Sequence, residues 1–219
     1  MQIVITGISQ GLGKELFDLL KKNKDLKIIA FSRRFLEEQY EFERQNPNIK
    51  LIPVDLSNLT EVETALDEIN VDDEVIFINN AATIYPIEKI ENIASSNIIS
   101  AFNLNLLSPI LIIKKLIKSK LFVINISTGA AKRAINNWSL YCSSKSGLEM
   151  FLSVIQQEGI DIINLDPGVM DTNMQKIIRS SNFVEVDYFK SLKTNNELKS
   201  AKDVANNIFE KYIKLRLNK

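Results

Sequence analysis

Tyr141 and Lys145 are the residues whose types and spacing first suggest chemistry. They lie four residues apart in a segment whose pattern predicts a helix, so they would share one helix face and could meet. A free phenol, with a pKa near ~10, is a weak acid-base catalyst at neutral pH, but a neighbouring cation lowers that pKa. The pair is therefore a candidate proton-transfer site. The alternative is a solvated helix face, because the Y-x-x-x-K pattern alone is weak.

A glycine-rich segment at residues 6–13 is the second candidate site. Residues 2–5 read as a short buried strand, and leucines at helical spacing follow the glycines. A strand, a glycine turn and a helix in this order let a phosphate approach bare backbone at a helix N-terminus. The glycine spacing is G-x-x-x-G-x-G, and the alternative is an ordinary tight connection.

Composition limits the function classes. The chain has 219 residues, 45% of them hydrophobic, with 27 Lys+Arg against 27 Asp+Glu, which favours one cytoplasmic α/β domain over residues 1–219. Zero net charge gives no signal for nucleic acid, and we expect no apolar run near the roughly 18 residues that span a bilayer. The first strand leaves no room for a signal peptide, and one cysteine cannot form an intrachain disulfide. Without histidine, neither a metal site nor a His-dependent triad is expected.

Short apolar runs alternate with longer amphipathic segments along the whole chain. This alternation predicts a Rossmann-type, doubly wound parallel sheet with helices on both faces. The runs finish in polar or turn residues, so the carboxyl edge of the sheet should form a binding cleft. The six expected strands lie near residues 2–6, 27–32, 49–54, 74–79, 120–126 and 160–165.

Taken together, five ordered motifs resemble the short-chain dehydrogenase/reductase family, in its compact single-domain branch. They are the glycine turn, residues 79–82, Asn105, residues 127–128 and the Tyr/Lys pair. The resemblance runs from residue 2 to about 215. Segments 125–128, 138–142 and 166–175 look most like the group that holds sepiapterin reductase and bacterial benzil reductase.

The resemblance implies that Tyr141 donates a proton to a substrate carbonyl oxygen while a nicotinamide delivers hydride to the carbon. Lys145 would lower the tyrosine pKa and hold the nicotinamide ribose. The family has a serine thirteen residues before the tyrosine, where this chain has Thr128. Ser127 is the alternative, and strand alternation should send the two side chains to opposite faces, with Thr128 favoured by its spacing.

Two further predictions concern Asn105 and the segment of residues 79–82. Asn105 matches an asparagine that, in the family, bends its helix and holds a water leading to the lysine; Asn103 is the alternative. Residues 79–82 read Asn-Asn-Ala-Ala where the family usually has Asn-Asn-Ala-Gly. We therefore expect strain at Ala82 if its backbone angle is one that only glycine tolerates.

The predicted cofactor is NADP(H). No acid stands about twenty residues past the glycine turn to hold an NAD ribose; Ser32 and Arg33 are there instead, and a guanidinium suits a 2′-phosphate. A solvated arginine pair is the alternative. Asp55 resembles the family's adenine-contacting acid, or else it caps a helix. The remaining cofactor positions implied by the resemblance are Gly7, Ser9, Gln10, Gly11, Leu12, Gly13, Leu56, Asn80, Ala81, Ala82, Pro167, Gly168, Val169 and Thr172, with Tyr141 and Lys145.

The substrate end is predicted more coarsely. Residues 173–198 should form a lid, and Trp138 and Met170 an apolar pocket wall, although a single Trp is as often core or dimer contact. Cys142 has no accompanying base and reads as buried filler. The helices around residues 93–118 and 138–158 would carry the contact of a homodimer or homotetramer, as in the family.

The predicted function is therefore NADPH-dependent reduction of a small-molecule ketone or diketone, in the manner of benzil reductase. Neither the C-terminal acid that anchors a pterin nor a seventh strand is recognised before Lys219. Reduction of a pterin, and a catalytically silent NADP-binding regulator, remain the alternatives. A sugar epimerase or dehydratase is disfavoured, because the chain has no residues for a sugar-nucleotide domain.

Overall fold

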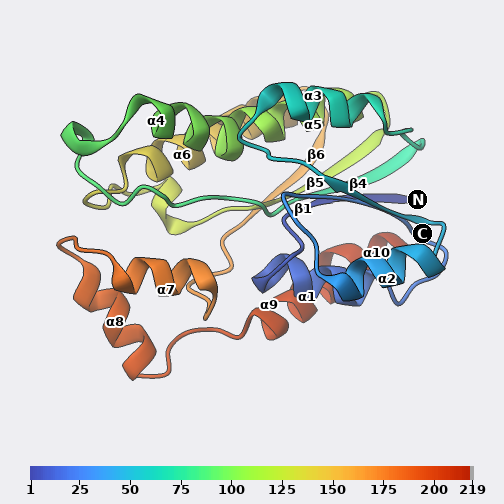
Figure 1. Cartoon of the computed structure of the whole chain (residues 1–219). Helices are drawn as coiled ribbons and strands as arrows, with labels where there is room; N and C mark the ends of the chain where they lie inside the picture. Colours follow the sequence, from blue (N-terminus) through green and yellow to red (C-terminus); the bar gives the residue numbers. More distant parts are fainter. Residues whose placement is uncertain (218–219) are drawn as a thin grey trace.

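Six parallel strands form a single sheet in the computed structural model, which describes residues 1–217 (Figure 1). The strand order is β3-β2-β1-β4-β5-β6, and all five pairings are parallel. The predicted Rossmann-type sheet is confirmed, and the described residues add no seventh strand. The strands are β1 (Gln2–Thr6), β2 (Lys27–Ser32), β3 (Ile49–Pro53), β4 (Glu74–Asn79), β5 (Lys120–Ile126) and β6 (Asp161–Leu165).

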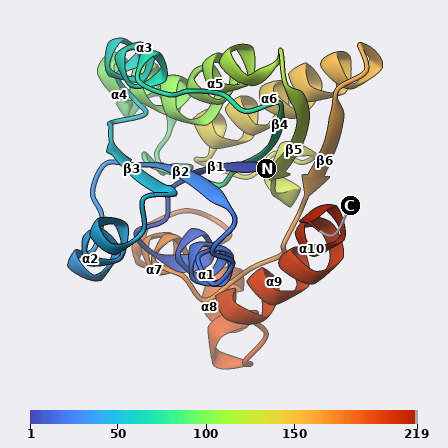
Figure 2. The ribbon, with the colours of Figure 1, turned by 90° about the vertical axis from the view of Figure 1, so that its right-hand side faces the viewer.

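Helices cover both faces of this sheet (Figures 1 and 2). One layer contains α3 (Leu59–Asp67), α4 (Ser95–Phe102), α5 (Ser108–Leu116) and α6 (Ser139–Gln157). The other contains α1 (Gly11–Leu20), α2 (Glu37–Gln45), α9 (Ala201–Ile208) and α10 (Lys214–Leu217). Two π-helical segments, η2 (Asn103–Leu107) and η4 (Phe209–Ile213), join α4 to α5 and α9 to α10; η1 (Ile90–Asn92) and η3 (Gly129–Ala131) are 3-10 turns.

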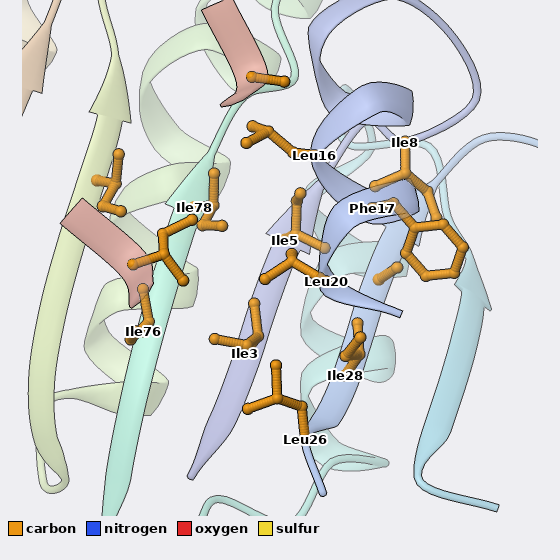
Figure 3. Packing of buried hydrophobic residues seen from close by; sticks show 14 of the residues in the cluster. Ile3, Ile5, Ile8, Leu16, Phe17, Leu20, Leu26, Ile28, Ile76 and Ile78 are labelled. Carbon is orange, nitrogen blue, oxygen red and sulfur yellow. The ribbon is translucent and has the colours of Figure 1, made fainter. Parts of the chain in front are cut away.

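The strands are buried on both faces, and alternate residues enter different cores. Ile76 and Ile78 pack into the core under α1 and α9, whereas Val75 and Phe77 pack under α3, α5 and α6. This alternation follows from the two-residue period of a strand. Figure 3 shows the first core, in which Ile3 and Ile5 of β1 meet Leu16 and Leu20 of α1.

The helix formed by α4, η2 and α5 corrects one expectation. Over Ser95–Leu116 it is long and apolar enough, by length and composition alone, to cross a membrane, although no apolar run of that length was expected. In the fold, its last turns face the sheet, with Ile112, Ile113 and Leu116 almost completely buried in the core. About 33% of the apolar window is buried within the chain, several other apolar residues pack partly against the core, and Ile99 and Leu107 are exposed.

Residues 173–198, the predicted lid, contain α7 (Asn173–Ser180) and α8 (Val186–Thr194). Both ends of this segment are tied together, because Asp171 N donates to Lys199 O at 3.0 Å and Lys199 N to Val169 O at 2.9 Å. Its aromatic residues Phe183 and Phe189 form a third apolar cluster with Trp138 and Tyr141. The segment therefore packs against Trp138 and Tyr141, two of the predicted site residues.

Candidate active site

The glycine turn is held by the end of the neighbouring strand β4. The Thr6 hydroxyl accepts hydrogen bonds from the backbone of Asn80 (3.0 Å) and Ala81 (2.9 Å), while Asn80 Nδ2 donates to Thr6 O and Gly7 O. A Cβ on Gly13 would lie 2.1 Å from Gly7 O, so only glycine fits where α1 begins. The N-terminus of α1 has no side-chain cap, and its free N–H groups suit an anion.

A cavity of about 570 Å³ opens beside this turn, at the carboxyl edge of the sheet. It extends from the glycine turn, past Arg33, to the aromatic cluster under the lid segment. All but three of the predicted site residues line it. These are Gly7, Ser9, Gln10, Gly11, Leu12, Ser32, Arg33, Leu56, Asn80, Ala81, Ala82, Ser127, Thr128, Trp138, Tyr141, Lys145, Pro167, Gly168, Val169, Met170 and Thr172.

Tyr141 and Lys145 share the inner face of α6, and both are buried. The ammonium of Lys145 donates to Ile126 O, at the end of β5, at 2.9 Å. Burial lowers the pKa of Lys145 to about 8. Burial also raises the pKa of Tyr141 to about 12, although a hydrogen bond with the Thr128 hydroxyl acts in the opposite direction. The expected lowering of the tyrosine pKa is therefore wrong for this arrangement, because desolvation of the phenolate dominates.

The two candidate hydroxyls point in different directions, as strand alternation predicted. The Thr128 hydroxyl is near enough to the phenol to act against the rise in the Tyr141 pKa, and it accepts from Ala130 N at 3.3 Å. Ser127 Oγ instead donates to the carboxylate of Glu149 on α6. The hydroxyl of Ser127 is thus engaged in holding α6, whereas that of Thr128 is beside the phenol.

Asn105 lies behind the cavity wall, inside the π-helical segment η2. Its amide is fully used: Oδ1 accepts from Thr83 N at 2.8 Å, and Nδ2 donates to Thr83 O at 2.8 Å and Ser144 Oγ at 3.1 Å. Ser144 precedes Lys145, so this asparagine braces the helix that carries the lysine. Asn103, the alternative, donates to Ser57 O at 2.8 Å on the far side.

Comparison with known proteins shows similarity to one family of oxidoreductases. The family model "short chain dehydrogenase" matches residues 1–182. A benzil reductase ((S)-benzoin forming) from Bacillus cereus is 34% identical, with 93% of this chain and 90% of the relative covered. Bovine sepiapterin reductase is 26% identical over 86% of this chain and 79% of its own. The crystal structure of the KRED1-Pglu enzyme superimposes with a TM-score of 0.79 at 24% identity, over 94% of this chain and 92% of that one.

The chain belongs to the short chain dehydrogenase family. The predicted recognition, including the benzil and sepiapterin reductase group, is confirmed. The protein is an oxidoreductase that acts on CH–OH or C=O groups of a small-molecule substrate. Its family and its relatives support a carbonyl reductase.

Within this short chain dehydrogenase, Asp55 is not among the residues that line the cavity, and its contact with the adenine stays a prediction. Its carboxylate accepts from the backbone (2.9 Å) and hydroxyl (2.8 Å) of Ser57, two residues later, in a local turn. The helix-capping alternative is wrong, because Asn58 caps α3. Val54 and Leu56 line the cavity in place of Asp55.

At three other predicted cofactor positions, Gly13, Ser32 and Ala82, the structure shows a contact or backbone angle that the sequence did not indicate. Gly13 is packed behind the turn rather than facing the cavity. The Ser32 hydroxyl accepts from Ile8 N at 3.0 Å, so it also fixes the turn. The strain expected at Ala82 is absent, because in residues 1–217 the only non-glycine residues with positive φ are Asn137 and Asn196.

The apolar end of the cavity holds residues that sequence reasoning missed. Trp138 stacks on Phe189 of α8, with ring centroids 5.2 Å apart. Helical spacing within α7 could have indicated one inward face, but the loop residues carry no such signal. The lining residues that were not named individually include Ile84, Arg133, Ile135, Met174, Gln175, Ile178 and Phe189, the last four within the predicted lid segment. Cys142 is half-buried in the same cluster, and burial raises the pKa of its thiol.

The two hydroxyls give a direct test. We expect Thr128→Ala to lower turnover of a carbonyl substrate by roughly tenfold or more, because the hydroxyl beside Tyr141 is lost. Ser127→Ala should keep turnover within a few-fold while lowering thermal stability, since it removes a bond to α6. Steady-state kinetics and thermal unfolding of both variants measure this. Crippled turnover in Ser127→Ala with normal turnover in Thr128→Ala would reverse the assignment.

Proposed function

We propose that this protein is an NADPH-dependent carbonyl reductase that converts a ketone or vicinal diketone, such as benzil, to the alcohol. One observation carries the proposal: a single cavity joins an anion-binding glycine turn and an arginine at one end to a buried tyrosine in an apolar pocket at the other. The 34% identical relative named as a benzil reductase supports the substrate class.

The nucleotide end fits NADP(H). The uncapped start of α1, with Gly11 at φ +56°, offers backbone N–H groups to a pyrophosphate. Exposed Arg33 and Arg34 line the cavity just beyond β2, where they suit a 2′-phosphate. Pro167, Gly168 and Thr172 would border the nicotinamide. When bound, the cofactor supplies hydride to the carbonyl carbon.

The chain's own residues would manage the proton. A Tyr141 whose pKa is raised to about 12 keeps its proton at neutral pH, so it can give that proton to the oxygen of a reduced carbonyl. Thr128 would hold the same oxygen in line with the phenol. Lys145, held at Ile126 O, would support the ribose side and stabilise the phenolate that remains after proton transfer.

The substrate pocket favours an apolar, flat molecule. Trp138 and Phe189 line it and stack with ring centroids 5.2 Å apart, and Phe183 packs against both of them at 5.8 Å. Such walls suit aryl groups. The bovine sepiapterin reductase relative keeps reduction of a pterin as a second candidate. The silent regulator has less support, because Tyr141, Lys145 and Thr128 come together at the cavity.

A substrate panel tests the activity. We expect oxidation of NADPH, followed at 340 nm, with benzil and other diketones, and weaker oxidation with aldehydes and sepiapterin. Tyr141→Phe should lower kcat by about 100-fold or more while leaving NADPH affinity within a few-fold, because only the proton donor is lost. Tight NADPH binding without turnover of any carbonyl would favour the regulator, and a preference for sepiapterin would favour the pterin reductase.

Cofactor choice is tested at Arg33. We expect Arg33→Ala to lower kcat/KM for NADPH by about tenfold or more and to leave NADH nearly unchanged, because the guanidinium meets only the 2′-phosphate. Arg44→Ala is the control, since Arg44 pairs with Glu37 on exposed α2. An unchanged ratio of the two efficiencies in Arg33→Ala would contradict the assignment.

We further propose that the protein is a homodimer or homotetramer built on the faces of α4, α5 and α6, and that it works in the cytoplasm. Ile99 (61% exposed), Met150 (67%) and Val154 (49%) present apolar surface on these helices. Met150→Glu with Val154→Lys should shift the sedimentation coefficient to that of a 24.9 kDa monomer, whereas Leu215→Glu on α10 should not. A wild-type monomer would refute the assembly, and cell fractionation would check the compartment.

A further inference from the structure

Gln175 is a buried polar side chain on the substrate side of the cavity. It is 4% exposed, lies on α7 and lines the cavity among apolar neighbours such as Met174 and Ile178. A buried amide without enough hydrogen-bond partners is costly, so its partners need an account. None of the roles assigned above uses this residue.

The orientation of the Gln175 amide is fixed by Arg179, one helical turn later. Arg179 Nη1 donates to Gln175 Oε1 at 3.2 Å. Because arginine has donors and no acceptor, the amide must turn its oxygen toward Arg179 and its Nε2 group the other way. The assignment of Oε1 and Nε2 in the Gln175 amide is therefore fixed, because only the oxygen can accept from Arg179.

Arg179 is itself held by charges at the base of the lid segment. Its Nη2 lies 3.8 Å from Asp171 Oδ1, and Lys193 of α8 contacts Asp171 Oδ2 at 2.6 Å. The side chain of Arg179 is 16% exposed, so it has little freedom to leave the amide. Asp171 thus links Lys193 of α8 to Arg179 through ion pairs. Arg179 in turn holds the amide oxygen of Gln175, which leaves the Nε2 group free.

Within residues 1–217 the Nε2 group of Gln175 donates to no acceptor, since Oε1 makes the one hydrogen bond of this side chain. Nε2 is not among the fully buried side-chain atoms that lack a partner, so it keeps exposure in the cavity that Gln175 lines, whereas the unpartnered indole Nε1 of Trp138 is fully buried. A free N–H donor that faces an apolar part of a cavity favours an acceptor on the ligand.

We propose that Gln175, oriented by Arg179, donates from Nε2 to a second oxygen of the substrate, next to the carbonyl that Tyr141 and Thr128 hold. The proposal rests on carbonyl reduction at this site and sharpens it: the preferred substrates are ketones with an oxygen on the adjacent carbon, above all vicinal diketones. Gln175 is then a specificity-determining residue and Arg179 a positioning residue.

Benzil and deoxybenzoin are the matched probes, because they share both phenyl rings and differ by one carbonyl oxygen. We expect the wild type to prefer benzil, and Gln175→Leu to lower kcat/KM for benzil by about tenfold or more while deoxybenzoin changes less than about threefold. Arg179→Met should give a smaller loss of the same selective kind, since the amide survives but can rotate. Lys176→Leu, an exposed change on the same helix, is the control.

Trp138, the one tryptophan of the chain, gives a second readout that needs no turnover. Quenching of its fluorescence should show benzil binding more tightly than deoxybenzoin in the wild type, with the difference lost in Gln175→Leu. An equal loss for both probes, or no change for either, overturns the Gln175 contact. If no carbonyl is reduced but the binding difference and its loss remain, reduction fails while the contact stands; circular dichroism confirms that each variant is folded.

Discussion

The buried ammonium of Lys145 is the constraint on which the site depends. Its charge is almost completely removed from water, and the strand-end carbonyl of Ile126 is its hydrogen-bond acceptor. This contact fixes the rotation of α6 over the sheet, and with it the position of Tyr141 one turn earlier. A rotation of α6 that exposed Lys145 would also move Tyr141 away from Thr128.

Other polar contacts can be understood as supports for that placement. Asn105 reaches from the π-helical segment η2 to Ser144, next to the lysine, and Ser127 binds Glu149 one turn further along α6. The wider turn of a π-helix lets Asn105 face inward between α5 and α6, at a point where a regular helix favours no asparagine. Neighbouring elements thus hold α6 at two successive turns, at Ser144 and Lys145 and then at Glu149.

Much of this arrangement could be predicted from the sequence because its signals are local. Four of the six strands match the expected ranges, and β3 and β6 differ by one residue at one end, since apolar runs bounded by turn residues are unambiguous in a parallel sheet. The glycine turn and the Tyr/Lys pair have fixed spacings. The cap of α3 could not be assigned in this way, because a short acid after a strand equally suits a local turn, and only the folded backbone shows that Asp55 bonds Ser57 while Asn58 caps the helix.

Properties that depend on several segments at once could not be predicted in this way. The environment of Gln175 comes from α7, the loop at Asp171 and α8, and no spacing in the sequence joins them. The shift in the Tyr141 pKa was expected with the wrong sign for a similar reason: the spacing to Lys145 was visible, but burial under the lid segment was not.

The two pKa shifts at the site have one physical cause and opposite chemical effects. Burial disfavours charge, so it keeps the proton on the Tyr141 phenol and weakens the hold of Lys145 on its own proton. For Lys145, whose folded pKa of about 8 lies below the ordinary lysine value of 10.5, charging the folded state at neutral pH costs stability that is regained as pH rises between these values. The carboxylate of Glu149 acts in the opposite direction to burial and favours the charged ammonium. Burial thus favours a resting site with a protonated Tyr141, and a protonated phenol is the state that the proposed proton transfer to a carbonyl oxygen requires.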